Sequence, residues 1–324
     1  MTHAIRIHQT GGPEVMQWEK VEVGAPGKGE VRIAHKAVGL NYIDVYHRTG
    51  LYPQPLPATL GTEGAGVVEA VGEGVEGLSV GDRVAYAGPI GAYAEARLIA
   101  ADRLVKLPDA IAFDTAAAMM LKGMTVDMLL NRVRQTKAGE TILVHAAAGG
   151  VGLILTQWAK AIGATVIGTV GTEEKAALAK AHGCDHVILF EQGDWVVEVA
   201  KLTDGKKVPV VYDSVGKATF LKSLDVLAKR GMLVSFGQAS GAVEPFPPGL
   251  LAQKGSLFLT RPTLFDYIAE PDELRASAQA LFDMVTSGKV KIDIGQRFAL
   301  KDAAEAHRAL EGRRTTGSTV LTVG

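Results

Sequence analysis

Residues 139–160, GETILVHAAAGGVGLILTQWAK, constrain the fold more than any other part of the chain. Residues 142–145 predict a buried strand, and small residues follow it before a helical pattern begins. Ala147, Gly149 and Gly152 fit a G-x-G-x-x-G pattern whose first glycine has become alanine. Gly149 lets the backbone approach a pyrophosphate, Gly152 lets a helix pack on the strand, and the N–H groups of the helix start attract phosphates. The segment therefore predicts a dinucleotide-binding site.

The residues after this turn are spaced as in a helix with one apolar face. Gly163 supplies the kind of residue at which helices commonly end. The apolar residues at helical spacing are Val151, Ile154, Leu155, Trp158, Ala159 and Ile162. A glycine pattern between a strand and such a helix is much more specific than a glycine pattern alone.

Two patterns divide the chain, and its 324 residues are enough for about two domains. Before residue 125, short β patterns at 4–7, 31–38, 66–71, 83–86 and 93–99 indicate a β-rich domain. After it, predicted strands at 142–145, 165–170, 186–189, 208–213, 232–236 and 256–260 alternate with helices. That rhythm is typical of an α/β doubly wound parallel sheet, the Rossmann fold. A further helix is expected over residues 272–287.

Charge and cysteine content exclude several classes of protein. The chain has 34 basic and 35 acidic residues, so no broad field favours nucleic acid or a membrane surface. Cys184 is the single cysteine, which suits a reducing compartment, and we expect a cytoplasmic protein. The N-terminus carries no signal-peptide pattern. The most hydrophobic run, residues 142–155, is shorter than a membrane span of about 20 residues and is interpreted as core.

The strand, turn and helix also resemble a known family. Residues 139–160 carry the signature of the quinone oxidoreductase and zeta-crystallin group of the medium-chain dehydrogenase/reductases, at Gly139, Glu140, Leu143, Ala147, Ala148, Gly149, Gly150, Gly152, Gln157 and Lys160. The segments GLNYIDVYHRTGLYP, LGTEGAGVVEAVG, GDRV, LKGMTV, VVYDSVG, SFG and TRP follow that family's order over essentially the whole chain. The resemblance implies a GroES-like catalytic domain at 1–124, completed by 263–324, and a Rossmann domain at 125–262.

The choice of cofactor depends on the end of the second Rossmann strand. An NAD site usually has an acidic residue about 20 residues after the glycine motif, and residues 167–172 contain none. Gly171 and Thr172 can instead surround a 2′-phosphate, with Lys175 supplying a positive charge. The alternative is that Lys175 is an ordinary solvated helix residue. We favour NADPH, as the resemblance also implies, although Phe190 replaces a tyrosine found in many relatives.

Two positions bear on metal binding. Zinc alcohol dehydrogenases of this superfamily have a cysteine and a histidine ligand where this chain has Asn41 and Thr62, and neither an amide nor a hydroxyl is a good zinc ligand. The eight histidines show no metal-binding spacing. We therefore expect no zinc. Without a Lewis acid, the favoured acceptors are already electrophilic, namely quinones and α,β-unsaturated carbonyls.

The remaining site residues follow mostly from the resemblance. Asn41 is interpreted either as the N-cap of a helix over residues 42–49 or, as in relatives, as a nicotinamide contact. Thr125 is expected beside the carboxamide. Tyr46 and Tyr52 are candidates to line the acceptor pocket or to donate a hydrogen bond to the acceptor, and ordinary packing is the alternative. Expected cofactor contacts are Ala148, Gly149, Gly150, Val151, Ser214, Phe236, Gly237, Leu259, Thr260, Arg261 and Arg313, with Arg314 leaving the last choice open.

Three functions fit these features. The favoured one is a zinc-free, NADPH-dependent quinone reductase, and the nearest alternative reduces the double bond of 2-alkenals. A non-enzymatic NADPH-binding protein with a structural or RNA-binding role is the third, and the absence of a basic stripe counts against RNA. The resemblance also implies a homodimer that pairs the last Rossmann strand, residues 256–260, with its twin.

Overall fold

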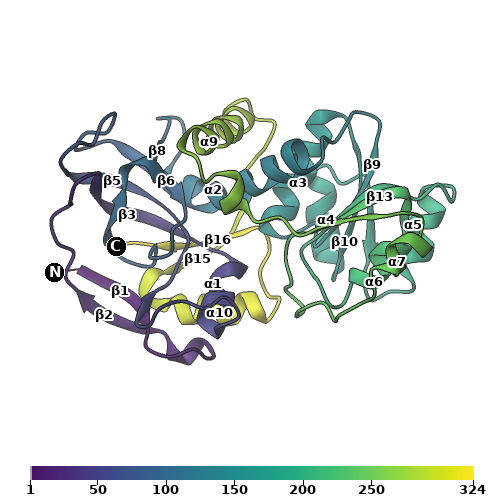
Figure 1. The fold of residues 1–324 in the computed structure, drawn as a ribbon, viewed down its shortest axis with the longest axis horizontal. Helices are drawn as coiled ribbons and strands as arrows, with labels where there is room; N and C mark the ends of the chain where they lie inside the picture. Colours follow the sequence, from purple (N-terminus) through teal and green to yellow (C-terminus); the bar gives the residue numbers. More distant parts are fainter. Residues whose placement is uncertain (1) are drawn as a thin grey trace. The chain divides into compact units, whose positions relative to one another are not determined.

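The structure, a computed structural model, describes residues 2–324 and divides the chain into two compact units (Figure 1). Unit 1 comprises Met1–Met124, Ile268–Thr286 and Ile292–Gly324, and unit 2 comprises Thr125–Tyr267 and Ser287–Lys291. The C-terminal segment thus returns to the first unit.

Unit 1 is built on a seven-stranded sheet with the order β15-β16-β3-β5-β6-β8, in which β7 also pairs with β3. A second sheet has the order β2-β1-β4. Buried Val, Ile and Leu side chains of β1, β3, β5 and β6 form the core with Tyr86 and Tyr93. The strands are β1 (Thr2–Ile7), β2 (Gln17–Val21), β3 (Glu30–Leu40), β4 (Ala58–Thr59), β5 (Glu63–Val71), β6 (Arg83–Ala87), β7 (Ala96–Ala100), β8 (Val105–Lys106), β15 (Ile294–Ala299) and β16 (Ser318–Thr322).

In the described part of unit 1, four α-helices lie wholly or mainly within the unit. They are α1 (Tyr42–Thr49), α2 (Phe113–Asp127), α9 (Pro271–Thr286) and α10 (Ala303–Glu311), and short 3-10 turns cover Pro13–Val15, Ala101–Arg103 and Leu300–Asp302. Helix α1 has the predicted limits. Asn41 is its N-cap, joined to Asp44 in a capping box, and Gly50 ends it in the left-handed conformation, with φ 82°.

Unit 2 contains a six-stranded sheet with the order β11-β10-β9-β12-β13-β14, and every pairing is parallel. This is the Rossmann order 3-2-1-4-5-6, so the predicted α/β class and doubly wound sheet are confirmed. The strands are β9 (Thr141–His145), β10 (Thr165–Val170), β11 (His186–Leu189), β12 (Val208–Asp213), β13 (Leu227–Ser235) and β14 (Phe258–Thr260). The helices are α3 (Gly150–Ile162), α4 (Glu173–Ala181), α5 (Trp195–Leu202), α6 (Phe220–Asp225), α7 (Gly249–Gln253) and α8 (Leu264–Tyr267), and a π-helical turn covers Met128–Val133.

Some predicted strands differ from those observed. The strand expected over residues 93–99 begins at Ala96, because Ala94 forms an isolated bridge with Ala4 and the Tyr93 N–H donates to the carbonyl of Leu60, outside the ladder that β7 forms with β3. Helix α3 ends at Gly163, with φ 98°, as the sequence predicts. Residues 142–155 lie in β9, the glycine turn and α3, in agreement with the interpretation as core. Within residues 2–324, no helix combines the length and apolar character that a membrane span requires.

Candidate functional site

The glycine turn between β9 and α3 has the geometry that phosphate binding needs. A Cβ atom on Gly152 would lie 2.3 Å from the carbonyl oxygen of Ala146 and 2.7 Å from Cα of Ala147, so only glycine lets α3 pack here. Gly149 is the N-cap of α3, and a Cβ there would meet only the Ala146 oxygen, at 3.3 Å. Gly152 therefore serves packing, whereas Gly149 leaves open the approach to the helix N-terminus.

A buried polar network joins the ends of three neighbouring strands beside this turn. His145, the last residue of β9, bonds Thr169 Oγ1 at 2.8 Å through Nδ1 and Ser223 Oγ at 3.0 Å through Nε2. Burial lowers the pKa of His145, so the imidazole is neutral. The Asp213 carboxylate, which ends β12, accepts from Thr219 Oγ1 at 2.7 Å and from the backbone N–H of Val215 at 2.7 Å. This network fixes the turn that contains Ser214.

Helix α4 begins where the sequence predicts a 2′-phosphate site. Thr172 is the N-cap, and its Oγ1 accepts a bond of 3.3 Å from the backbone N–H of Lys175. A Cβ on Gly171 would meet no atom within 4 Å, so the backbone is open on that side. Phe190 stacks on Trp195 at a centroid distance of 6.3 Å, and Trp195 also contacts His145. Phe190 therefore belongs to an aromatic cluster with Trp195 and His145. The sequence alone does not predict this packing role.

The other predicted contacts in unit 2 lie at the same edge of the sheet. Since parallel strands end at a common edge, the turns after β9, β10, β12, β13 and β14 are brought together there. A Cβ on Gly237 would lie 2.6 Å from the carbonyl oxygen of Ser214, so these two turns touch. This edge carries Ala148, Gly149, Gly150, Val151, Gly171, Thr172, Ser214, Phe236, Gly237 and Arg261, while Leu259 and Thr260 belong to β14 itself. Thr125 is buried in α2.

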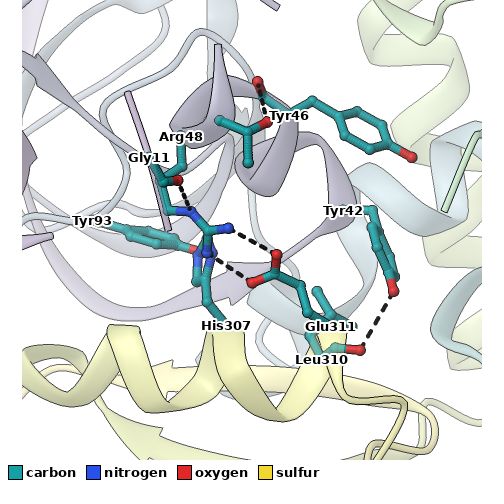
Figure 2. A network of polar contacts seen from close by, with 9 residues as sticks. Gly11, Tyr42, Tyr46, Arg48, Tyr93, His307, Leu310 and Glu311 are labelled. Atoms are coloured by element: carbon teal, nitrogen blue, oxygen red, sulfur yellow. Dashed lines mark hydrogen bonds and ion pairs between the residues drawn. The ribbon is translucent and has the colours of Figure 1, made fainter. Parts of the chain in front are cut away.

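The candidate acceptor residues of unit 1 form an aromatic cluster on α1 and the loop after it. The Tyr46 and Tyr52 rings meet edge to face at 5.2 Å, and Tyr42 packs on Tyr46 at 6.2 Å. The backbone N–H of Tyr52 donates to the carbonyl of Tyr46 at 3.0 Å, which holds the loop against the helix. Figure 2 shows the Tyr46 ring extending away from the polar contacts of the same helix.

Polar contacts of Tyr42 and Arg48 join α1 to α10 (Figure 2). The fully buried Arg48 forms two bonds of 2.8 Å with the Glu311 carboxylate and contacts His307 Nδ1 at 3.1 Å. Burial, together with the Arg48 charge, lowers the pKa of His307 to about 3. Arg313, a predicted cofactor contact, follows α10 in the left-handed region, with φ 56°.

The two positions that correspond to zinc ligands do not fit a metal. Asn41 Nδ2 donates to Glu63 Oε2 at 2.7 Å, and Thr62 Oγ1 donates to Asp44 Oδ1 at 3.0 Å, so each group donates a hydrogen. Glu63 is also paired with the Lys122 ammonium at 3.0 Å. Across residues 2–324, no group of three or more His, Cys, Asp or Glu side chains could hold a metal ion. Glu63, Lys122 and Asp44 were not among the predicted site residues.

Comparison with known proteins identifies the family. Residues 27–109 match the model of the alcohol dehydrogenase GroES-like domain, and residues 150–280 match that of the zinc-binding dehydrogenases. The chain is 54% identical over 323 residues to the quinone oxidoreductase of Pseudomonas aeruginosa, covering 99% of each chain. The chain belongs to the quinone oxidoreductase family. The predicted family and the GroES-like nature of the β-rich unit are thereby confirmed.

Two other proteins are also similar to this chain over nearly its full length. The crystal structure of Escherichia coli quinone oxidoreductase complexed with NADPH has 49% identity and a TM-score of 0.97, with 99% of each chain covered. A 2-haloacrylate reductase from a Burkholderia species is 46% identical over 330 residues, with 99% of each chain covered. Although one matched family model is named for zinc, the Asn41 and Thr62 contacts in this member of the quinone oxidoreductase family present no zinc ligands.

Proposed function

We propose that this protein reduces quinones with NADPH and without a metal. The observation that carries the proposal is the full-length similarity, at a TM-score of 0.97, to a quinone oxidoreductase complexed with NADPH. The local structure supports this proposal. The glycine turn is open at Gly149, and residues 167–172 contain no acidic side chain that would repel a 2′-phosphate.

We assign the cofactor to the carboxyl edge of the unit 2 sheet. Ala148, Gly149, Gly150 and Val151 would bind the pyrophosphate through backbone N–H groups at the start of α3. Gly171, Thr172 and Lys175 would bind the 2′-phosphate, the hydroxyl of Thr172 donating a hydrogen while its lone pair caps α4. Further cofactor contacts would come from Phe190, Ser214, Phe236, Gly237, Leu259, Thr260, Arg261 and Arg313.

The chain's contribution to chemistry is mainly positioning. NADPH, when bound, supplies a hydride from nicotinamide C4. Asn41 and Thr125 would orient the nicotinamide, and Tyr46 and Tyr52 would line the acceptor pocket and exclude water. A tyrosine hydroxyl there would donate a hydrogen bond to the oxygen on which negative charge develops.

Reduction of a conjugated double bond is the second candidate, because a 2-haloacrylate reductase is 46% identical to this chain. The same hydride can be delivered to a carbon that is conjugated with a carbonyl group. Steady-state oxidation of NADPH with 1,4-benzoquinone, 9,10-phenanthrenequinone, 2-alkenals and 2-chloroacrylate separates the two. We expect the highest kcat/KM with quinones, and a higher value with an alkenal or haloacrylate would favour the second candidate.

We further propose a cytoplasmic homodimer. Within residues 2–324, strand β14 is the last in its sheet and pairs only with β13, and Phe258 in it is 57% exposed. An apolar edge strand of this kind invites pairing with a second copy. Phe258→Lys should convert the dimer to a monomer in light scattering, whereas Leu221→Lys on the exposed face of α6 should not. A monomeric unmodified protein would contradict this assembly.

A further inference from the structure

Glu63, the first residue of β5, makes three hydrogen bonds in the interior of unit 1. Its Oε2 accepts from Asn41 Nδ2 at 2.7 Å and from Lys122 Nζ at 3.0 Å, and its Oε1 accepts from the backbone N–H of Leu121 at 2.8 Å. The Glu63 side chain is 0% exposed and that of Lys122 is 7% exposed. A carboxylate so placed is stable only with such partners.

The Glu63 carboxylate lies where the backbones of β3 and α2 come close together. Leu121 lies in the interior of α2, where N–H groups normally donate to a carbonyl four residues earlier. A Cβ on Gly39 of β3 would lie 2.4 Å from Glu63 Oε2 and 2.1 Å from the Ala117 carbonyl oxygen of α2. Glycine at residue 39 thus makes room for the carboxylate and for the helix at the same place.

These partners belong to the two segments that we assign to the nicotinamide. Asn41 is the N-cap of α1, directly before the tyrosines of the acceptor cluster. Lys122 lies three residues before Thr125 in α2. A single carboxylate therefore holds both the Asn41 amide and the turn of α2 that leads to Thr125.

We infer that Glu63 is a positioning residue for the nicotinamide end of the cofactor, with Lys122 as its fixed counter-charge. This inference rests on the proposed function, because Asn41 and Thr125 gain this role only with NADPH bound. The carboxylate fixes which end of the Asn41 amide faces the protein, since only the NH₂ group can donate to it. The Lys122 ammonium, 3.0 Å from Glu63 Oε2, supplies the opposite charge that a buried carboxylate needs.

The test compares hydride transfer with binding of a cofactor fragment that lacks nicotinamide. In Glu63→Gln the shape is kept, but one carboxylate oxygen becomes an NH₂ group. Since Asn41 and Lys122 share one oxygen and Leu121 bonds the other, at least one of these donors then faces a second donor, and Lys122 loses its counter-charge. We expect the single-turnover rate of NADPH oxidation by 1,4-benzoquinone to fall about 100-fold, the cost of a misplacement of about 1 Å. The dissociation constant of adenosine 2′,5′-bisphosphate should change less than about twofold, because we assign its phosphate contacts to residues of unit 2.

Stereochemistry gives a second readout that a loss of stability would not change. NADPH labelled with deuterium on one face of C4 should transfer label from a single face in the unmodified protein. A nicotinamide that is less firmly held should transfer a measurable fraction from the other face in Glu63→Gln. Glu140→Gln is the matched control, because it breaks a bidentate pair with Arg134 in unit 2 and should leave both readouts unchanged.

Two further variants complete the test. Glu63→Gln/Lys122→Met removes both buried charges together, so it should fold even where Glu63→Gln does not, and it should show the same slow transfer. In an Asn41→Ala background, Glu63→Gln should cost much less than 100-fold, since positioning through Asn41 is already lost. Transfer within about threefold of the unmodified rate in both Glu63 variants would overturn the inference, as would a parallel loss of bisphosphate binding. An unmodified protein that does not oxidise NADPH with quinones would instead refute the proposed function.

Discussion

The hydroxyl of Tyr93 donates a hydrogen bond of 2.9 Å to Asp44 Oδ2 in a part of unit 1 that is closed to solvent. The same carboxylate accepts from Thr62 Oγ1 and from the backbone N–H of Asn41. Burial raises the pKa of Asp44 to about 7, although these hydrogen bonds and the Lys122 charge oppose the rise. Asp44 therefore takes up a proton on folding between about pH 4 and pH 7.

This proton uptake predicts a pH dependence for Asp44→Asn. Stability contributed by Asp44 is greatest below about pH 4 and is lost as the pH rises to about 7, because the folded protein must then bury the charge. The stability of the unmodified protein minus that of the variant should thus fall by more than about 1 kcal/mol between pH 5 and pH 8. Urea unfolding at both pH values measures this difference.

Buried histidines do not obscure that comparison. Burial, aided by neighbouring arginines, lowers the pKa of His35 and His307 to about 3, so both are neutral in the folded protein. Their contribution to stability is lost as the pH falls from about 6.5, the opposite direction to Asp44. It is common to both proteins and cancels in the difference. A difference that is constant or grows with pH would show that Asp44 is already ionised at pH 5.

Lys175 should determine the preference for NADPH over NADH. We expect NADPH to bind at least tenfold more tightly in the unmodified protein, a difference of about 1.4 kcal/mol. Lys175→Ala should remove most of it by removing the charge opposite the 2′-phosphate. Lys180→Ala, in the last turn of the same helix, is the matched control and should leave the ratio unchanged. Fluorescence titration measures both constants, and equal constants in the unmodified protein would refute the assignment.

Two glycines of one turn should respond differently to substitution. Gly152→Ala places a Cβ 2.3 Å from a backbone oxygen, so it should destabilise unit 2 by about 1–3 kcal/mol. Gly149→Val should cost less stability than Gly152→Ala, since its Cβ lies 3.3 Å from the Ala146 oxygen, but it should weaken NADPH binding more than tenfold, because its side chain fills the approach to the pyrophosphate. Thermal unfolding and cofactor titration of both variants separate these effects. Gly149→Val with normal NADPH affinity would place the pyrophosphate elsewhere.

Tyr52→Phe tests how much a proton donor contributes. The substitution keeps the ring contact with Tyr46 and removes only the hydroxyl. NADPH affinity should stay the same, and quinone turnover should fall by at most about tenfold to a hundredfold. A loss of about a thousandfold or more at unchanged NADPH affinity would make Tyr52 an essential acid and positioning an insufficient account.

Much of the fold is readable in the sequence because its signals are local. The strands at 165–170, 186–189 and 208–213 have the predicted limits, since parallel strands in the core are continuous apolar runs. The limits of α1 follow from its cap at Asn41 and its stop at Gly50. Strand β2 was not predicted, because most of its side chains are exposed and its pattern is polar. Pairing with a neighbouring strand of the sheet, and not the pattern of its own residues, makes this segment a strand.

The polar interior of unit 1 was not predictable in the same way. Glu63 and Lys122 are far apart in the sequence and each reads locally as a solvated charge, yet the fold buries both. The signal that was available is indirect. Asn41 and Thr62 occupy the positions of metal ligands, but neither side chain is a good metal ligand. The positive charge that a buried Glu63 carboxylate requires is therefore expected from another residue of the chain.

The central claim is tested most directly by anaerobic single-turnover mixing of the NADPH-loaded, EDTA-treated protein with 1,4-benzoquinone. We predict oxidation of one NADPH for each quinone reduced, at a rate above that of the protein-free reaction and unchanged by EDTA. Tight NADPH binding with no acceleration for any quinone or enone would contradict the account and favour a non-enzymatic NADPH-binding protein.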